Sequence, residues 1–420
     1  MAKIIKVGGA SGFWGDSAIA TPQLLTESLD YLVYDYLAET TMSILARARG
    51  KDPAMGYATD FVTVTMAQNL RVIAARGVKV LSNAGGLNPG ACRDALLAIA
   101  TAQGIEINIA VVSGDDVMNL LPQLREEKTR EMFFGLPLPE KIHSMNAYLG
   151  ARAVTQALRN GAQMVITGRG VDSALIVGAL MHEFNWDWRD WNKLAQASLA
   201  GHIIECGAQG SGGLFTDWET VPDWDNIGYP IVECADDASF VVTKPRDTGG
   251  LVSRPSVSEQ ILCEIGDPAE YILPDVICDL REVKLEEIGE HRVRVSGAAG
   301  REPTSSYKVS ATFQEGYQLE VGLAIRGIDA VDKAQKTGDA LLKRTRRMMA
   351  SRGFSDYADA AVEIIGAESL YGPHSRRGDA REVVRVLADR FILGGVSLGR
   401  LYPGETELAN GLLVTTTETT

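Results

Sequence analysis

The chain has 420 residues, 45% of them hydrophobic and 23% charged, and 41 Lys and Arg against 54 Asp and Glu give a formal net charge of −13. This length predicts two domains with sizeable cores. The acidic balance excludes nucleic acid as the main ligand, because phosphate backbones require a basic surface. The five cysteines form no CxxC pair and indicate free thiols in a reducing compartment. With neither a signal peptide nor a membrane span in the pattern, we expect a cytoplasmic protein that contacts no membrane.

The first half of the chain alternates short apolar strands with longer helices. The strands are expected at residues 4–7, 78–83, 107–112 and 163–167, and the helices at residues 21–49, 60–76, 89–103 and 147–160. This alternation predicts an α/β domain at residues 1–235, with a mostly parallel sheet between two helical layers. Each strand ends in a glycine-rich or polar break. Because ligands bind outside the carboxyl ends of such strands, the four breaks should line one crevice.

A second, smaller α+β domain is expected at residues 236–410. Its segments are shorter and richer in strand patterns, and they precede an amphipathic helix predicted at residues 329–352. The strands are expected at residues 240–243, 290–296, 307–313, 319–325 and 381–387. Residues 411–420 read as a frayed tail.

The first break, residues 8–16, contains Gly8, Gly9 and Ser11 but matches neither a dinucleotide fingerprint nor a P-loop. Glycine amides can approach an anion closely, so we interpret this loop as an anion-binding site. Gly85 and Gly86 offer the same donors in the second break. A sharp turn without a ligand is the competing interpretation of both loops.

Polar side chains flank the later breaks. Asn83 and Asn88 could bind a substrate oxygen, and Pro89 marks Asn88 as the N-cap of the next helix, which is the competing role. Arg169 could hold a carboxylate or phosphate in a bidentate pair, with Asp172 as its orienting partner or as a catalytic base. A purely structural Arg–Asp ion pair remains the alternative.

Residues 201–218 carry the densest polar cluster. Glu205 and His202 suit acid and base roles, and Gln209 suits substrate binding. Cys206 could serve as a nucleophile if its pKa were depressed, although a buried small hydrophobic residue is its usual role. The five histidines show no metal-binding spacing, so we predict no metal ligands and no cofactor, with a divalent metal as the less favoured alternative.

Six stretches resemble the acyclic terpene utilisation family, the AtuA-like proteins. They are residues 8–16, 35–39, 83–89, 146–151, 201–218 and 248–252. Asn146, in the fourth stretch, joins the substrate-binding candidates. The resemblance implies catabolism of branched or terpenoid acids, with coenzyme A as part of the substrate. Some members carry a ferredoxin-like domain, which we expect to be absent here, and others work with a small separate protein of that kind.

The resemblance further implies hydration or carbon–carbon lyase steps, so we expect a lyase, either a hydratase/dehydratase or a carbon–carbon lyase, that acts on a branched or terpenoid carboxylic acid or its coenzyme A thioester. We expect it to be a homo-oligomer with a small-molecule substrate. A small partner subunit with a ferredoxin-like fold is a further possibility that the resemblance implies. Two alternatives stay open. One is acyl or coenzyme A transfer through Cys206. The other is a non-catalytic, ligand-binding subunit of an enzyme complex.

Overall fold

The computed structural model describes residues 3–16, 18–365, 396–397 and 412–413. The chain forms two compact units, Met1–Gly316 and Tyr317–Thr420. The domain boundary expected at residue 235 falls inside the first unit, because the strands on both sides of it belong to one sheet.

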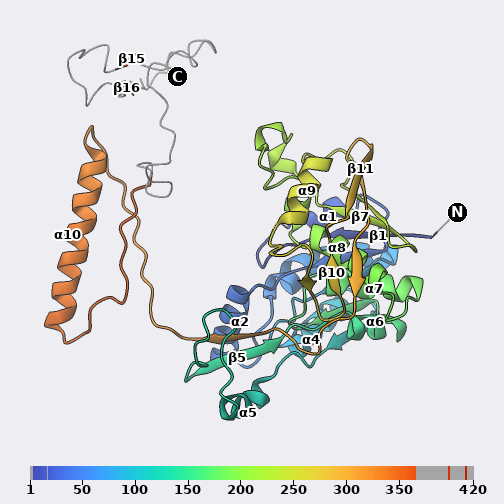
Figure 1. Ribbon diagram of the computed structural model, residues 1–420, viewed down its shortest axis with the longest axis horizontal. Helices are drawn as coiled ribbons and strands as arrows, with labels where there is room; N and C mark the ends of the chain where they lie inside the picture. The colour runs from blue at the N-terminus through green and yellow to red at the C-terminus, as the bar shows by residue number, and fades with distance from the viewer. Residues whose placement is uncertain (1–2, 17, 366–395, 398–411, 414–420) are drawn as a thin grey trace. The chain divides into compact units, whose positions relative to one another are not determined.

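The central sheet of the first unit is mixed and has the order β11-β12-β8-β7-β1-β2-β3-β6-β4. Figure 1 labels β1, β7 and β11 among its strands. Its parallel part consists of β1 (Ile4–Gly9), β2 (Tyr31–Tyr34), β3 (Lys79–Ser82), β6 (Met164–Thr167) and β4 (Ile109–Val112). Its antiparallel part consists of β7 (Ile231–Ala235), β8 (Phe240–Thr243), β12 (Arg292–Ser296) and β11 (Lys284–Gly289). The predicted α/β class is therefore confirmed, with an antiparallel extension that the sequence did not indicate.

Alternate side chains of the parallel strands enter two separate cores. Tyr31 and Val33 of β2 pack into one core with the later helices, whereas Leu32 and Tyr34 pack into the other. Because successive strand residues point to opposite faces, helices are needed on both sides of the sheet. The helices are α1 (Ala20–Leu24), α2 (Glu39–Lys51), α3 (Ala67–Arg76), α4 (Pro89–Ala102), α5 (Leu121–Glu126), α6 (Arg152–Arg159), α7 (Ala174–Phe184), α8 (Trp191–Ile204) and α9 (Arg254–Leu262).

Two predicted helices are interrupted by strands. The helix expected at residues 21–49 is split by β2, whose four residues are all buried. The helix expected at residues 147–160 begins only at Arg152, after β5 (Ile142–Ala147). A short, fully buried strand lacks the polar alternation that would distinguish it from a helix segment.

Helix α8 is the most deeply buried helix segment near the sheet. Every residue from Leu194 to Ile204 is buried, since α8 packs against α7 on one side and β13 (Ala299–Arg301) on another. β13 belongs to a small sheet with β10 (Ile277–Asp279) and β9 (Tyr271–Ile272). A rigid, buried helix fixes the residues at its carboxyl end in space.

The remaining strands lie outside the main sheet. β14 (Val309–Phe313) pairs with β5 in the first unit. In the second unit, α10 (Ala330–Ser351) agrees with the predicted amphipathic helix, and β15 (Val396–Ser397) pairs with β16 (Leu412–Leu413). The strand expected at residues 319–325 is absent, and this segment is largely exposed. The strand expected at 381–387 and most of the predicted tail lie outside the described residues.

Within the described residues, the helices are too short or too polar to span a bilayer.

Candidate active site

The first glycine loop and the carboxyl end of α8 are in direct backbone contact. A methyl group at Gly9 would collide with the carbonyl oxygen of Ile204, and one at Gly12 would lie 2.6 Å from the carbonyl carbon of Cys206. Gly85 makes a similar approach to the carbonyl oxygen of Thr167 at the end of β6. These glycines therefore allow the strand-end loops to converge without intervening side chains.

The amides assigned to an anion are largely engaged within the protein. The Gly9 amide donates to the Pro230 carbonyl at 2.9 Å, and the Gly86 amide donates to the Asn83 carbonyl at 3.0 Å. Gly8 lies inside β1, and the Ser11 hydroxyl donates to the Asp35 carbonyl at 3.0 Å. The loop fixes the backbone around Asp35, and the pattern offers little of the free donor surface that an anion site requires.

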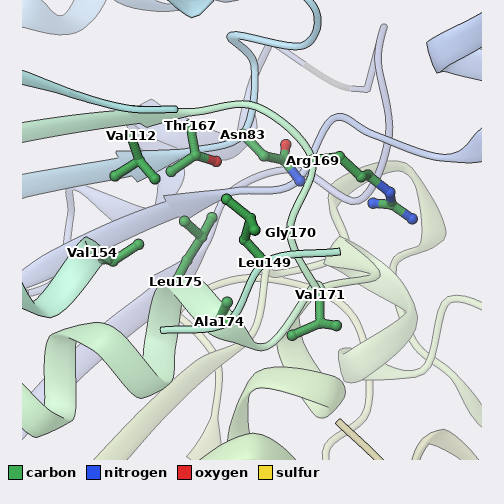
Figure 2. A pocket seen from close by; sticks show the side chains of 11 residues that line it. Asn83, Val112, Leu149, Val154, Thr167, Arg169, Gly170, Val171, Ala174 and Leu175 are labelled. Atoms are coloured by element: carbon green, nitrogen blue, oxygen red, sulfur yellow. The ribbon is translucent and has the colours of Figure 1, made fainter. Parts of the chain in front are cut away.

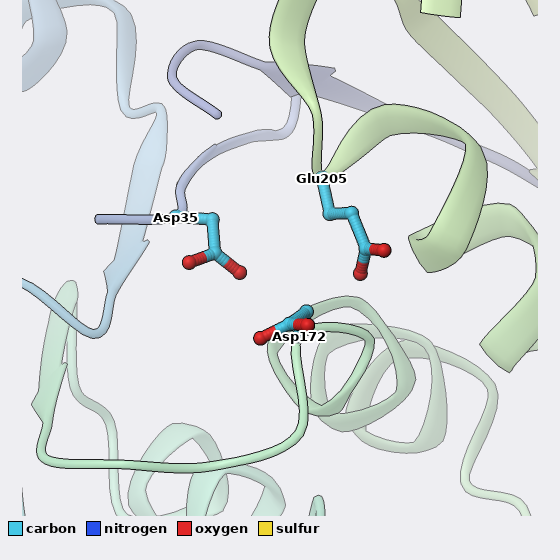
Figure 3. A group of neighbouring side chains, drawn as sticks. All are labelled: Asp35, Asp172 and Glu205. Atoms are coloured by element: carbon cyan, nitrogen blue, oxygen red, sulfur yellow. The ribbon is translucent and has the colours of Figure 1, made fainter. Parts of the chain in front are cut away.

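Three carboxylates meet where these loops converge. Asp35 follows β2, Asp172 lies between β6 and α7, and Glu205 caps α8. One carboxylate oxygen from each lies within 4.8 Å of the others, and Figure 3 shows the three groups turned toward a common gap. The sequence predicted Asp172 and Glu205 as site residues but missed Asp35.

Asp35 is held by its neighbours through one oxygen only. Its Oδ1 accepts hydrogen bonds from Asn83 Nδ2 at 2.7 Å and from the Leu37 amide at 3.1 Å, whereas its buried Oδ2 has no hydrogen-bond partner. Burial, and next the charge of Asp172, raise the pKa of Asp35 well above its ordinary value. Asn83, predicted to bind substrate, thus positions Asp35.

Arg169 anchors the Asp172 loop from a buried position. Its Nη1 donates to the Leu37 carbonyl at 2.7 Å and to Asp172 Oδ1 at 3.0 Å, and its guanidinium lies 4.3 Å from the Tyr148 ring centroid. Only 4% of the side chain is exposed. The predicted Arg169–Asp172 pair is formed, and Arg169 orients the Asp172 carboxylate.

A small cavity lies beneath this loop, and Figure 2 shows Arg169 pointing away from its apolar lining. The cavity measures about 10 Å³ and is lined by side chains such as Val112, Val154 and Leu175. It has room for about one water molecule. It is therefore too small to hold an organic ligand.

His202 and Glu205 form a buried pair one helical turn apart. His202 Nδ1 lies 3.1 Å from Glu205 Oε1, while His202 Nε2 has no hydrogen-bond partner. Burial raises the pKa of Glu205 to about 7 despite the opposing effect of His202. Burial lowers the pKa of His202, but the hydrogen bond and charge of Glu205 outweigh it and give a net increase. The carboxyl group can therefore exchange a proton near neutral pH.

Cys206 and Gln209 follow α8 but differ from Glu205 in environment. Burial, and next the Glu205 charge, raise the pKa of the Cys206 thiol, which opposes the thiolate that a nucleophile requires. Gln209 lies in the short 3-10 helix Gly207–Ser211, and its side chain is half-buried.

Two further predicted residues support the loops. Asn146 Nδ2, on β5, donates to Asp115 Oδ2 at 2.8 Å, and the same oxygen accepts from the Arg169 amide at 2.9 Å. Asn88 caps α4 by accepting from the Ala91 amide at 3.3 Å and also donates to the Pro53 and Met55 carbonyls at 3.0 Å. Asp115, like Asp35, was not predicted.

Comparison with known proteins adds a family to this geometry. The model of the family described as "Acyclic terpene utilisation family protein AtuA" matches residues 5–390, nearly the whole chain. The chain belongs to this family. The match includes all three carboxylates of the site, so the resemblance seen in the sequence is confirmed and links the chain to acyclic terpene utilisation.

Short segments also match proteins of another kind. The chain is similar to a protein named "Probable glycine dehydrogenase (decarboxylating) subunit 1" from Rhizorhabdus wittichii, with 73% identity over 68 residues, 15% of this chain and 15% of that protein. Its namesake from Novosphingobium aromaticivorans is 69% identical over 42 residues, 10% of this chain and 9% of that protein. The chain thus spans only a small part of these curated relatives. No solved structure matches the chain.

Proposed function

We propose that the chain is a lyase of branched or terpenoid acid catabolism that adds or removes water across a carbon–carbon double bond, or cleaves a carbon–carbon bond, in a carboxylic acid or its coenzyme A thioester. The observation that carries this proposal is the convergence of Asp35, Asp172 and Glu205 within 4.8 Å at the strand ends. The membership of the acyclic terpene utilisation family supports the substrate class.

Hydration needs one group that takes a proton from water and one that gives a proton to carbon. Glu205 or Asp172 takes the proton as the water oxygen bonds to the β-carbon. The electron pair of the double bond moves to the α-carbon, which receives a proton from the carboxyl group that remains protonated. Dehydration is the same sequence in reverse. Two nearby carboxyl groups that cannot both ionise easily suit this exchange.

His202 acts on this chemistry through Glu205. Its Nδ1 lies within hydrogen-bond distance of Glu205 Oε1, and its side chain is buried. It therefore orients the carboxyl group and lowers the pKa of Glu205 against the effect of burial. Arg169 has the corresponding role for Asp172. We therefore assign His202 and Arg169 as positioning residues, with Glu205 and Asp172 as the proton-transfer groups.

The test is solvent-isotope exchange on a panel of branched enoyl and 3-hydroxyacyl substrates, each supplied as free acid and as coenzyme A thioester. Wild-type protein in heavy water should place deuterium at the α-carbon of one substrate or raise its mass by one water. Glu205→Gln and Asp172→Asn should each lower this rate by about 10²–10⁴-fold, while Glu286→Gln, an exposed residue, keeps it. Full turnover in both site variants would overturn the proposal.

A further inference from the structure

The three-carboxylate cluster lacks enough positive charge for its depth in the protein. Asp172 has Arg169 and Glu205 has His202 as direct partners. Asp35 receives hydrogen bonds only from the Asn83 side-chain amide and a backbone amide, and Arg169 acts on it through its charge alone. Like charges within 4.8 Å repel strongly when water is excluded. A positive group in the gap would relieve this repulsion.

A second observation points into the same gap. Asp35 is 5% exposed, and its Oδ2 is buried without a hydrogen-bond partner. Asn83 and the Leu37 amide both donate to Oδ1, so rotation of the carboxylate would give Oδ2 a partner only by taking these hydrogen bonds from Oδ1. Figure 3 shows this carboxylate facing the gap that Asp172 and Glu205 also face. A buried polar atom without a partner is uncommon in proteins, and a cation in the gap would supply a partner for this one.

The spacing suits a hard divalent cation. Carboxylate oxygens bind Mg²⁺ or Ca²⁺ at about 2.0–2.6 Å, so two ligands on opposite sides of such an ion lie about 4–5 Å apart. The three oxygens are within 4.8 Å of one another. The ligands are all oxygens, which favours Mg²⁺, Mn²⁺ or Ca²⁺ over thiolate- or imidazole-seeking metals.

We propose that Asp35, Asp172 and Glu205 form a binding site for one divalent cation of the Mg²⁺, Mn²⁺ or Ca²⁺ class. Three protein ligands leave coordination positions open for water or for a substrate oxygen. Arg169 and His202 then support two of the ligands from outside, as partners of ligating groups do in metal sites. This reverses the expectation from histidine spacing, which took no account of Asp35.

The site also explains how an anionic substrate could approach three acids. A divalent cation neutralises two of the three negative charges and offers its open positions to a carboxylate or hydroxyl oxygen. One oxygen of each residue is enough for binding, so the other oxygen of each can keep its hydrogen bond with Asn83, Arg169 or His202.

The experiment measures binding without any substrate. Full-length protein is stripped of metal with a chelator, and MnCl₂ is titrated by calorimetry while bound Mn²⁺ is followed by electron paramagnetic resonance. We expect one Mn²⁺ per chain, displaced by Mg²⁺ or Ca²⁺. Asp35→Asn and Asp172→Asn should each weaken binding at least about tenfold. Asp275→Asn is the control, since Asp275 is also a buried aspartate but accepts its hydrogen bond from the Ala151 amide, outside the cluster.

Absence of Mn²⁺, Mg²⁺ and Ca²⁺ binding up to about 1 mM would overturn the proposal. So would binding that is equal in wild type and in the two cluster variants. Circular dichroism identifies a variant that fails to fold, and the decision then rests on the other variant and on the wild-type stoichiometry. Cation binding with no isotope exchange would count against the proposed reaction and leave the site standing.

Discussion

His202 Nδ1 lies 3.1 Å from Glu205 Oε1, in a pair of which both side chains are buried. Each group changes the pKa of the other: Glu205 raises that of His202, and His202 opposes the rise that burial causes in Glu205. Protonation of the site and stability of the fold are therefore linked.

This linkage predicts the effect of pH on the metal-free protein. Burial raises the pKa of Glu205 to about 7, above the unfolded value of about 4.3. The stability due to neutral Glu205 is therefore full below about pH 4.3 and is lost as the pH rises through about 7. The raised pKa of His202 acts in the same direction. Between about pH 5 and 8, the free energy of unfolding of wild type should therefore fall by up to about 3 kcal/mol more than that of Glu205→Gln.

Urea unfolding in a chelating buffer checks this at several pH values. The quantity compared is the difference in free energy of unfolding between wild type and Glu205→Gln, in which the titration of groups remote from Glu205 cancels and the coupled titration of His202 remains. Parallel curves for the two proteins across this range would contradict the linkage.

The contact between the first loop and α8 predicts a strong effect of a single methyl group. Gly9→Ala places a Cβ against the Ile204 carbonyl, so backbone must shift, and we expect a loss of about 2–4 kcal/mol in the free energy of unfolding. Gly50→Ala is the control, because nothing lies within 4 Å of its added Cβ in α2 and alanine favours a helix by up to about 1 kcal/mol. Urea unfolding measures both variants. A free energy of unfolding for Gly9→Ala equal to that of wild type would show that the loop and α8 are not in close contact at Gly9.

The ion pairs and hydrogen bonds of Glu183 predict how the free energy of unfolding changes in acid. Burial opposes its ionisation, but hydrogen bonds from Lys3, Lys79 and Tyr31 outweigh burial and lower its pKa to about 2. Its contribution is present above its unfolded pKa and is lost as the pH falls through about 2. Glu183→Gln should cost about 1–3 kcal/mol at neutral pH, because it removes the charge paired with Lys3 and Lys79 and weakens the hydrogen bond from the buried Tyr31 hydroxyl.

Thermal or urea unfolding from neutral pH downwards measures this contribution. The variant should approach wild-type stability as the pH falls. Glu286→Gln, in an exposed pair with Arg294, should stay within about 0.5 kcal/mol of wild type at every pH. A gap between Glu183→Gln and wild type that does not narrow in acid would refute the assignment.

The raised pKa of Cys206 predicts that its thiol is alkylated slowly in the folded chain. Burial and the nearby Glu205 charge disfavour its thiolate, which is the form that reacts. Iodoacetamide at mildly alkaline pH should alkylate Cys206 at least about tenfold more slowly in the folded chain than in the chain unfolded by guanidinium. Peptide mass spectrometry follows each cysteine separately. Labelling of the folded chain at the unfolded rate would instead revive acyl transfer through this thiol.

The sequence contained part of the site because polar residues stand out directly after apolar runs. Asp172 and Glu205 were recognised in this way, and so was the Arg169–Asp172 pair. Asp35 was missed because β2 was read as part of one long helix, which hid a strand end. Its aromatic and β-branched residues, Tyr31 and Val33 among them, were the available signal. The resemblance to the family in residues 35–39 pointed to the same place.

The pairing of distant strands could not be read in the same way. β7 lies beside β1 although more than half of the chain separates them, and nothing local in either strand encodes this neighbour. The domain boundary was therefore drawn where the local pattern changed, in the middle of one sheet. Asp115 and Asn146 meet for the same non-local reason, through the arrangement of β5 beside the end of β4.

The order of the strands along the chain determines which of them have been synthesised when Glu205, the last residue of the cluster, leaves the ribosome. Glu205 emerges before β7, which borders β1, and before β14, which pairs with β5. Until those strands follow, β1 presents an unpaired edge of the kind that recruits other chains. A nascent polypeptide interrupted between residues 205 and 313 thus holds every carboxylate of the cluster yet lacks the frame around it, and co-translational protection of that intermediate is expected to decide how much protein is recovered.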